Sequence, residues 1–237
     1  MDVAFAKVNE ETVQLLKHHH CEVIIPVNHQ CCGSLPAHTG DLDTAKKLAR
    51  QNCEIFSQYQ FDYIVMNSAG CSAFMKQYGT LFNGTGVEEY PQSVSKRVMD
   101  LTEFLLLPDI EQLNCYPGHR FHGKRIAYHD ACHLVHGQGI KEQPRKLIQQ
   151  LPGMEFCELP ESTWCCGSAG TYNLTHYDDS MKILARKMGN IKQIHPDVLV
   201  TGNPGCLLQL QYGIQKEGLN IELLHTATFL RSVYLGD

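Results

Sequence analysis

The chain has 237 residues, 43% of them hydrophobic, and a formal net charge of −5 at pH 7. Its length allows a buried core without disulfide support, and its acidic balance argues against nucleic acid as a partner. Its apolar runs are too short to cross a bilayer, and its first residues lack the pattern of a secretory signal. We therefore expect a cytoplasmic protein that meets a membrane only through its partners.

Helices and strands are expected to alternate along the first half of the chain. Apolar residues at helical spacing predict a helix over 2–20, and the β-rich run 21–27 predicts a buried strand. A second helix is expected over 39–59, because Asp41 and Asp43 suit its first turn. The following segments are then expected: a strand over 63–67, a short helix ending at Tyr78, a loop over 80–95 and a connecting helix over 98–107.

The second half repeats this alternation after a stretch over 113–123 that contains glycine and proline and is the expected domain boundary. Strands are expected over 124–129, 154–159, 198–201 and 221–224, and helices over 143–151, 178–194, 207–217 and 227–235. Such alternation predicts parallel βαβ units, whose functional residues gather in the loops after the strands. The sequence therefore predicts an α/β protein of two tandem pseudo-repeats, over 1–112 and 124–237.

Seven of the eleven cysteines follow a repeated pattern. In the first half, Cys71 comes 39 positions after the second cysteine of Cys31-Cys32-Gly33. In the second half, Cys206 comes 40 positions after the second cysteine of Cys165-Cys166-Gly167. In a reducing compartment, clustered cysteines indicate metal ligands or redox groups rather than structural disulfides. Each of these cysteines lies at or near the end of a predicted strand, so we expect them to converge.

The second half holds one cysteine that the first half lacks. Cys132 follows a predicted strand and precedes Cys165 by 33 positions, whereas the same step back from Cys31 falls about two residues before Met1. We therefore expect the first repeat to be truncated at its N-terminus and the chain to begin inside a longer ancestral protein.

These motifs resemble the duplicated cysteine-rich CCG domain, which occurs in heterodisulfide reductase, in lactate-utilisation iron–sulfur proteins and in the iron–sulfur subunit of glycolate oxidase. The local sequence is most similar to the glycolate oxidase subunit. The resemblance is carried by the segments 38–42, 67–71, 128–139, 164–174 and 201–207 and covers nearly the whole chain.

The resemblance implies an iron–sulfur cofactor, and the thiol counts indicate where it would bind. Four thiolates suffice for a [4Fe–4S] cluster, and the second half offers Cys132, Cys165, Cys166 and Cys206. Zinc competes, because four thiolates also suit a closed tetrahedral site. The first half keeps the three metal-ligand candidates Cys31, Cys32 and Cys71, with His29 or His38 as a fourth. That site is expected to be degenerate, to bind zinc or to bind nothing.

Two features depart from the family pattern. The glycolate oxidase subunit begins with a ferredoxin-like region, which this chain lacks, so a separate ferredoxin-like part is among the expected partners. In its fullest form the domain ends each motif with Cys-x-x-Cys, but Phe74 and Gln209 occupy the last positions here. Neither half therefore offers the five thiolates of a noncubane cluster.

By this resemblance, a flavoprotein subunit would oxidise glycolate to glyoxylate, and this chain would relay its electrons towards a quinone or another acceptor. The complex could then lie peripherally on the inner membrane. No catalytic residue is expected in this chain, since it has neither a glycine-rich dinucleotide fingerprint nor a supported triad. Two alternatives stay open: a lactate-utilisation iron–sulfur subunit, and a non-catalytic zinc module that serves folding or assembly.

The remaining cysteines and the histidines have weaker signals. Cys21, Cys53, Cys115 and Cys157 fall outside the repeat and are expected to be buried hydrophobic residues or incidental thiols. Around Cys132 lie three histidines: His129, His133 and His136. For these, a hydrogen-bonding role and no role are equally favoured, and direct metal ligation is less favoured than either.

Overall fold

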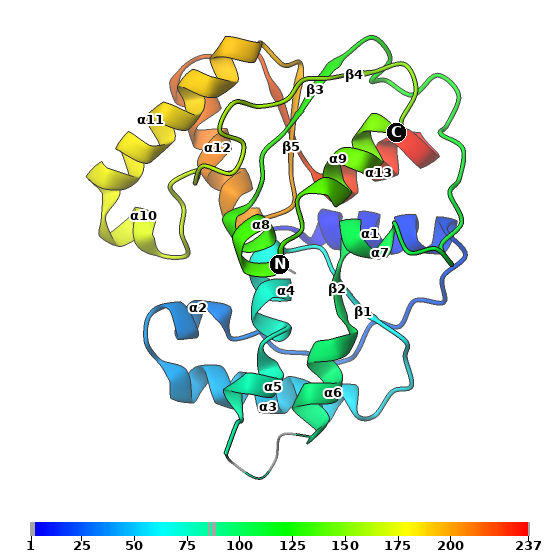
Figure 1. Cartoon of the computed structure of the whole chain (residues 1–237), viewed down its shortest axis with the longest axis vertical. Coiled ribbons are helices and arrows are strands. Elements are labelled where there is room, and N and C mark those ends of the chain that lie inside the picture. The colour runs from blue at the N-terminus through cyan, green and yellow to red at the C-terminus, as the bar shows by residue number, and fades with distance from the viewer. Residues whose placement is uncertain (1–2, 85, 87–88, 237) are drawn as a thin grey trace.

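A parallel four-stranded sheet forms the centre of the second half in the computed structural model, which describes residues 3–84, 86 and 89–236 (Figure 1). The strand order is β4-β3-β5-β6. The strands are β3 (Arg125–Tyr128), β4 (Glu155–Phe156), β5 (Val198–Thr201) and β6 (Glu222–His225). Central β5 is buried at all its positions, as expected for a strand with both faces covered.

Helices cover both faces of this sheet, and the alternation of side chains along the strands separates two cores. Ile126 and Val200 pack with α13 on one face, whereas Ala127 and Leu199 pack with α11 and α12 on the other. The helices are α8 (Cys132–Gln138), α9 (Glu142–Gln149), α10 (Tyr172–Thr175), α11 (Tyr177–Ile194), α12 (Pro204–Lys216) and α13 (Thr226–Leu235).

The first half has a smaller sheet, in which β1 (Ile64–Met66) and β2 (Val98–Asp100) pair in parallel. A third core lies beneath it, where Ala49 and Cys53 pack with Tyr78 and Phe82. The helices are α1 (Ala6–His18), α2 (Ser34–His38), α3 (Leu42–Phe56), α4 (Ala69–Met75), α5 (Tyr78–Leu81), α6 (Glu89–Arg97) and α7 (Leu101–Phe104).

Helices of each half pack against the other half, and both halves contribute to one core. Helix α1 packs on α13, where Leu15 joins the same apolar cluster as Leu230 and Arg231 Nε donates to Gln14 Oε1 over 2.8 Å. In the other direction, α9 of the second half packs against α7 of the first, and α4 packs against α8. Residues on both sides of the stretch 113–123 therefore contribute to a common core.

The α/β class with parallel strands is confirmed, but three local expectations are wrong. The run 21–27 is not a strand: Ile25 is 64% exposed and Val27 is 70% exposed. In the second half, β3 stands between β4 and β5, but the described part of the first half has no strand in that place. The run 21–27 therefore has no neighbour to which its backbone can bond.

The other two errors concern the end of the first half. The expected connecting helix over 98–107 begins as β2 and turns helical only at Leu101, because the side chain of Asp100 caps α7 through the backbone N–H of Thr102. The expected loop over 80–95 contains most of α6. No helix within the described residues is long and apolar enough to cross a membrane.

Candidate metal centre

The four thiols of the second half converge at the carboxyl ends of β3 and β5. Cys132 is the first residue of α8, directly after the turn that follows β3, and Cys206 lies in the first turn of α12 after β5. Cys165 and Cys166 lie in the loop that joins β4 to α10. Hydrogen bonds link the side chains in a row, from Cys132 to Cys165, to Cys166 and to Cys206.

This row of hydrogen bonds divides the thiols into two kinds. Bonds from Cys132 and Cys166 hold the pKa of Cys165 well below its usual range, and a bond from Cys166 does the same for the pKa of Cys206. Their donor roles, together with burial, raise the pKa of Cys132 and of Cys166. Cys165 and Cys206 are thus the acceptor thiols of the row, whose pKa is lowered, and thiolate is the form that ligates metals.

Backbone geometry at Gly167 requires glycine. Its φ is +96°, and a Cβ atom there would lie 2.6 Å from the carbonyl oxygen of Ser180 in α11. This close approach lets the Gly167 backbone N–H donate to Cys165 Sγ over 3.3 Å. A donor of this kind stabilises a thiolate or a cluster sulfur and tunes its potential.

A buried ion pair fixes the loop that carries Cys132. Asp130 is fully buried and accepts two hydrogen bonds from the Arg145 guanidinium, at 2.9 and 2.8 Å. Arg145 also binds Glu158 and Ser162, which lie in the same loop as Cys165 and precede it. Sequence reasoning did not identify this network, because neither the spacing of Asp130 from Arg145 nor their residue types indicate that they meet.

A second cation, from a different helix, holds the same segment. Lys187 of α11 is buried and donates to the backbone carbonyls of Glu161 and Ser162, at 2.6 and 3.3 Å. Burial lowers the pKa of Lys187 to about 8. Arg145 and Lys187 together therefore tie the segment before Cys165 to α9 and α11.

The first half brings its three thiols together in a similar way. Cys32 donates to Cys31 and to Cys71, which lowers the pKa of Cys31 to about 5 and that of Cys71 to about 7. The two histidines considered as a fourth ligand are engaged elsewhere. His29 Nδ1 lies 3.0 Å from the Pro26 carbonyl, and His38 Nε2 lies 3.1 Å from His133 Nε2.

Asn203 connects the two sites. Its Oδ1 accepts from the backbone N–H of Gly70, which precedes Cys71, over 3.1 Å. Its Nδ2 donates to Cys206 Sγ over 3.5 Å, and Ala69 N donates to the Gly202 carbonyl over 3.1 Å. The turns that lead to Cys71 and to Cys206 therefore lie against each other.

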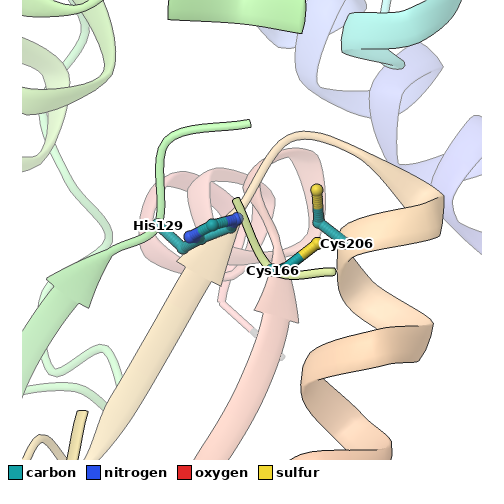
Figure 2. A group of neighbouring side chains, drawn as sticks. All are labelled: His129, Cys166 and Cys206. Carbon is teal, nitrogen blue, oxygen red and sulfur yellow. The ribbon is translucent and has the colours of Figure 1, made fainter. Parts of the chain in front are cut away.

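His129 also belongs to the centre of the second half. It is fully buried, and its ring lies with the thiols of Cys166 and Cys206, their ligand atoms within 4.8 Å of one another (Figure 2). No other group of three such donors lies this close within the described part of the chain. His133 Nδ1 lies 3.6 Å from Cys132 Sγ, whereas His136 is exposed and contacts the Thr163 carbonyl.

The thiols and the buried imidazole form a donor set that fits a thiolate-bound metal centre. Both Cys166 and Cys206 are buried, so a metal held there would be shielded from water. Four converging thiols can bind an iron–sulfur cluster or a single zinc ion. Of the cysteines outside the repeat, Cys53 and Cys157 are buried, with Cys53 packed in the third core, whereas Cys21 and Cys115 are only half-buried.

Comparison with known proteins places these features in a family. The model of the cysteine-rich domain named CCG matches residues 1–76 and 126–211. The probable glycolate oxidase iron-sulfur subunit of Bacillus subtilis is 35% identical over 233 residues, which are 97% of this chain and 52% of that protein. This chain therefore spans about half the length of that relative.

Two further relatives match nearly the whole chain. Lactate utilization protein A of Oceanobacillus iheyensis is 31% identical over 98% of this chain and 93% of that protein. One subunit of the fumarate reductase (CoM/CoB) of Methanothermobacter marburgensis is 30% identical over 100% of this chain and 45% of its own length. The resemblance expected from the cysteine motifs is thus confirmed.

Proposed function

The chain belongs to the family of proteins built from the cysteine-rich CCG domain, and from this premise we propose that it is an iron–sulfur electron-transfer subunit of a glycolate-oxidising complex. The observation that carries the proposal is the convergence of four thiols with a buried imidazole at the strand ends. The similarity to the B. subtilis glycolate oxidase subunit supports the choice of substrate.

In this proposal, Cys132, Cys165, Cys166 and Cys206 hold a [4Fe–4S] cluster in the second repeat. Such a cluster, when bound, accepts and gives up one electron at a time. The protein positions the four thiols, shields two of them from water and offers N–H donors from Gly167 and Asn203 to the sulfurs. The first repeat, with Cys31, Cys32 and Cys71, would bind zinc or remain a degenerate site.

We also propose that the halves over 1–112 and 124–237 are tandem repeats. Three pairs of features support this: parallel neighbours β1–β2 and β5–β6, left-handed glycines at Gly33 and Gly167, and the helix pairs α1–α13 and α9–α7. In each repeat the cysteines follow strand ends, which fits the general placement of functional loops in parallel α/β units.

The chemistry on glycolate would belong to partners. A flavoprotein subunit would oxidise glycolate to glyoxylate, and this chain would carry the electrons onward without binding the substrate. A separate ferredoxin-like part would complete the relay. We place the complex in the cytoplasm or peripherally on the inner membrane, with membrane contact made by the partners.

A lactate-utilisation subunit is the second candidate, because this chain spans 93% of lactate utilization protein A from O. iheyensis. The two are separated by purifying the native complex through a tag on this chain and measuring dye reduction with each substrate. Glycolate-dependent reduction supports the main proposal, whereas lactate-dependent reduction without glycolate activity favours the second candidate.

The metal itself is tested by measuring iron, zinc and acid-labile sulfide in anaerobically purified protein, with Cys165→Ser as the control. About four iron and four sulfide per chain, lost in the variant, are expected for one cluster. Stoichiometric zinc without sulfide would overturn the electron-transfer role and leave a non-catalytic module for folding or assembly.

A further inference from the structure

His129 stands at the carboxyl end of β3, three residues before Cys132. Its backbone N–H donates to the Val200 carbonyl over 2.9 Å, which extends the bonding between β3 and β5 by one residue. This bond fixes the main chain, and Figure 2 shows the ring beside Cys166 and Cys206. The position of the imidazole is therefore set by the sheet rather than by a mobile loop.

Within the described residues, neither ring nitrogen of His129 bonds a nitrogen or oxygen atom, and the interaction of the ring is with the Cys206 thiol. The other three buried histidines each use one ring nitrogen: His19 with the Glu111 carbonyl, His119 with the Pro152 carbonyl and His225 with the Ala227 backbone N–H. A buried polar group left without a partner lowers the stability of the fold, so buried groups are nearly always paired. His129 thus has no partner other than a candidate ligand thiol at the point where the thiols converge.

The adjacent carboxylate is not available to the ring. Both oxygens of Asp130 accept from Arg145, at 2.9 and 2.8 Å, so the pairing of that carboxylate is already accounted for. The metal-binding side chains near the imidazole are then Cys166 and Cys206. Their Sγ atoms and a ring nitrogen of His129 lie within 4.8 Å of one another. A neutral imidazole nitrogen binds iron and zinc well.

We propose that His129 is a fifth protein donor to the metal centre of the second repeat, binding iron through a ring nitrogen beside the four cysteine sulfurs. This inference rests on the proposed iron–sulfur function. Five donors are one more than a regular [4Fe–4S] cluster needs, so one iron differs from the others in its coordination. Because the imidazole is neutral, a thiolate in its place would add negative charge and lower the cluster's reduction potential.

The test is nitrogen hyperfine coupling, measured by pulsed electron paramagnetic resonance on anaerobically purified protein carrying ¹⁵N-labelled histidine. We expect strong coupling from a directly bound nitrogen in the wild type. His129→Cys should keep iron and sulfide, lose the coupling and titrate at a lower reduction potential. His129→Leu should lose the coupling as well, and its packing volume is similar to that of histidine.

His133→Gln is the matched control, because His133 also lies near a ligand sulfur, 3.6 Å from Cys132 Sγ. It should retain the full coupling. Loss of the coupling in this variant, or its persistence in both His129 variants, would overturn the assignment. A coupling as weak as that of a hydrogen-bonded nitrogen would also overturn it. If both His129 variants fail to fold, the absence of strong coupling in the wild type, or its loss in the control, still overturns the assignment.

The two levels of proposal fail differently. Iron and sulfide in the wild type without strong nitrogen coupling would overturn the role of His129 and leave the iron–sulfur function intact. A wild-type protein that holds no iron or sulfide would overturn both.

Discussion

In both halves of the molecule a Cys-Cys-Gly loop lies against the fourth residue of a long helix. A Cβ atom on Gly33 would lie 3.0 Å from the Ala45 carbonyl oxygen of α3, and one on Gly167 would lie 2.6 Å from that of Ser180 in α11. The thiols behave alike as well, since the pKa is raised at Cys32 and at Cys166 by their donor roles. The loop design is therefore common to both sites.

The halves differ in how many candidate metal ligands lie at the ends of their strands. The second half has β3 between β4 and β5, and the end of this strand supplies both Cys132 and His129. The described part of the first half has no strand in the corresponding place, and its site has three thiols. The number of candidate ligands at each site therefore follows from the number of strand ends that meet there. The shape of the Cys-Cys-Gly loop, by contrast, follows from the local sequence.

The largest expected difference between the halves is in metal content. Cys206→Ser should lose most of its iron and sulfide, because the variant removes one of the four thiolates that hold the cluster. Cys71→Ser, the matched change in the first half, should keep about four iron per chain. Iron and sulfide analysis of both variants checks this. Equal losses in the two variants would mean that the sites hold metal together.

A large effect on stability is expected from replacing Arg145. Its partner Asp130 is fully buried in the second half. Arg145→Met leaves that carboxylate unpaired and should lower the free energy of unfolding by about 3–5 kcal/mol. Denaturant unfolding of the metal-free protein measures the loss. The double change Arg145→Met with Asp130→Asn should recover part of it, and no recovery would show that the guanidinium acts through other contacts.

The two glycines offer a direct comparison of the loops. Alanine at either position must adopt a left-handed φ, which costs about 1–3 kcal/mol. Gly167→Ala should cost about 1–3 kcal/mol more than Gly33→Ala, because its Cβ would lie closer to a carbonyl oxygen. Urea unfolding of both variants tests the order. A larger effect at Gly33 would indicate that α11 yields more readily than α3.

Asp100 at the end of β2 caps α7, and His225 at the end of β6 caps α13. The contributions of these two residues to stability should depend on pH in opposite directions. Burial lowers the pKa of His225 to about 4, whereas burial raises the pKa of Asp100 to about 6. Since folding disfavours the charged imidazole, the contribution of His225 is present above pH 6.5 and is lost as pH falls towards 4, by at most about 3 kcal/mol.

The carboxylate at the other strand end has the opposite dependence. Folding disfavours the charged form of Asp100, so its contribution is greatest below pH 3.8 and is lost as pH rises through 6. As pH is lowered from about 7 to 4, the urea midpoint of unfolding should therefore fall less in His225→Asn than in the wild type. In Asp100→Asn the acid loss should steepen. Identical pH profiles in all three proteins would contradict both assignments.

The smallest effect is expected at the residues three positions before the last cysteine of each repeat. Asn203 donates to Cys206 Sγ and Ser68 hydrogen-bonds Cys71. Asn203→Ala should lower the cluster's reduction potential slightly without loss of iron, because one N–H donor to sulfur is removed. Ser68→Ala should leave the potential unchanged. Voltammetry on both variants makes the comparison, and a shift in Ser68→Ala alone would reverse it.

Much of this architecture could be predicted from local patterns. Helical spacing and β-rich runs predict α11, β5 and α13 closely, because each element buries one face or one run of its own residues. The cysteine spacing alone predicts that Cys165, Cys166 and Cys206 come together, since loops after parallel strands meet at one edge of a sheet. These features depend on contacts that the periodicity of the chain itself encodes.

Other features depend on partners distant in the chain. The run 21–27 has the composition of a strand but lacks a neighbour, and α1 packs on α13 rather than within its own half. The pairing of Asp130 with Arg145 likewise arises only when α9 folds back on the end of β3. For His129 the sequence favoured a lesser role, whereas the sheet buries its ring beside two thiols. Residue types set which chemistry is available, and only tertiary packing decides which donors meet, because burial and proximity are properties of neighbours far away in the sequence.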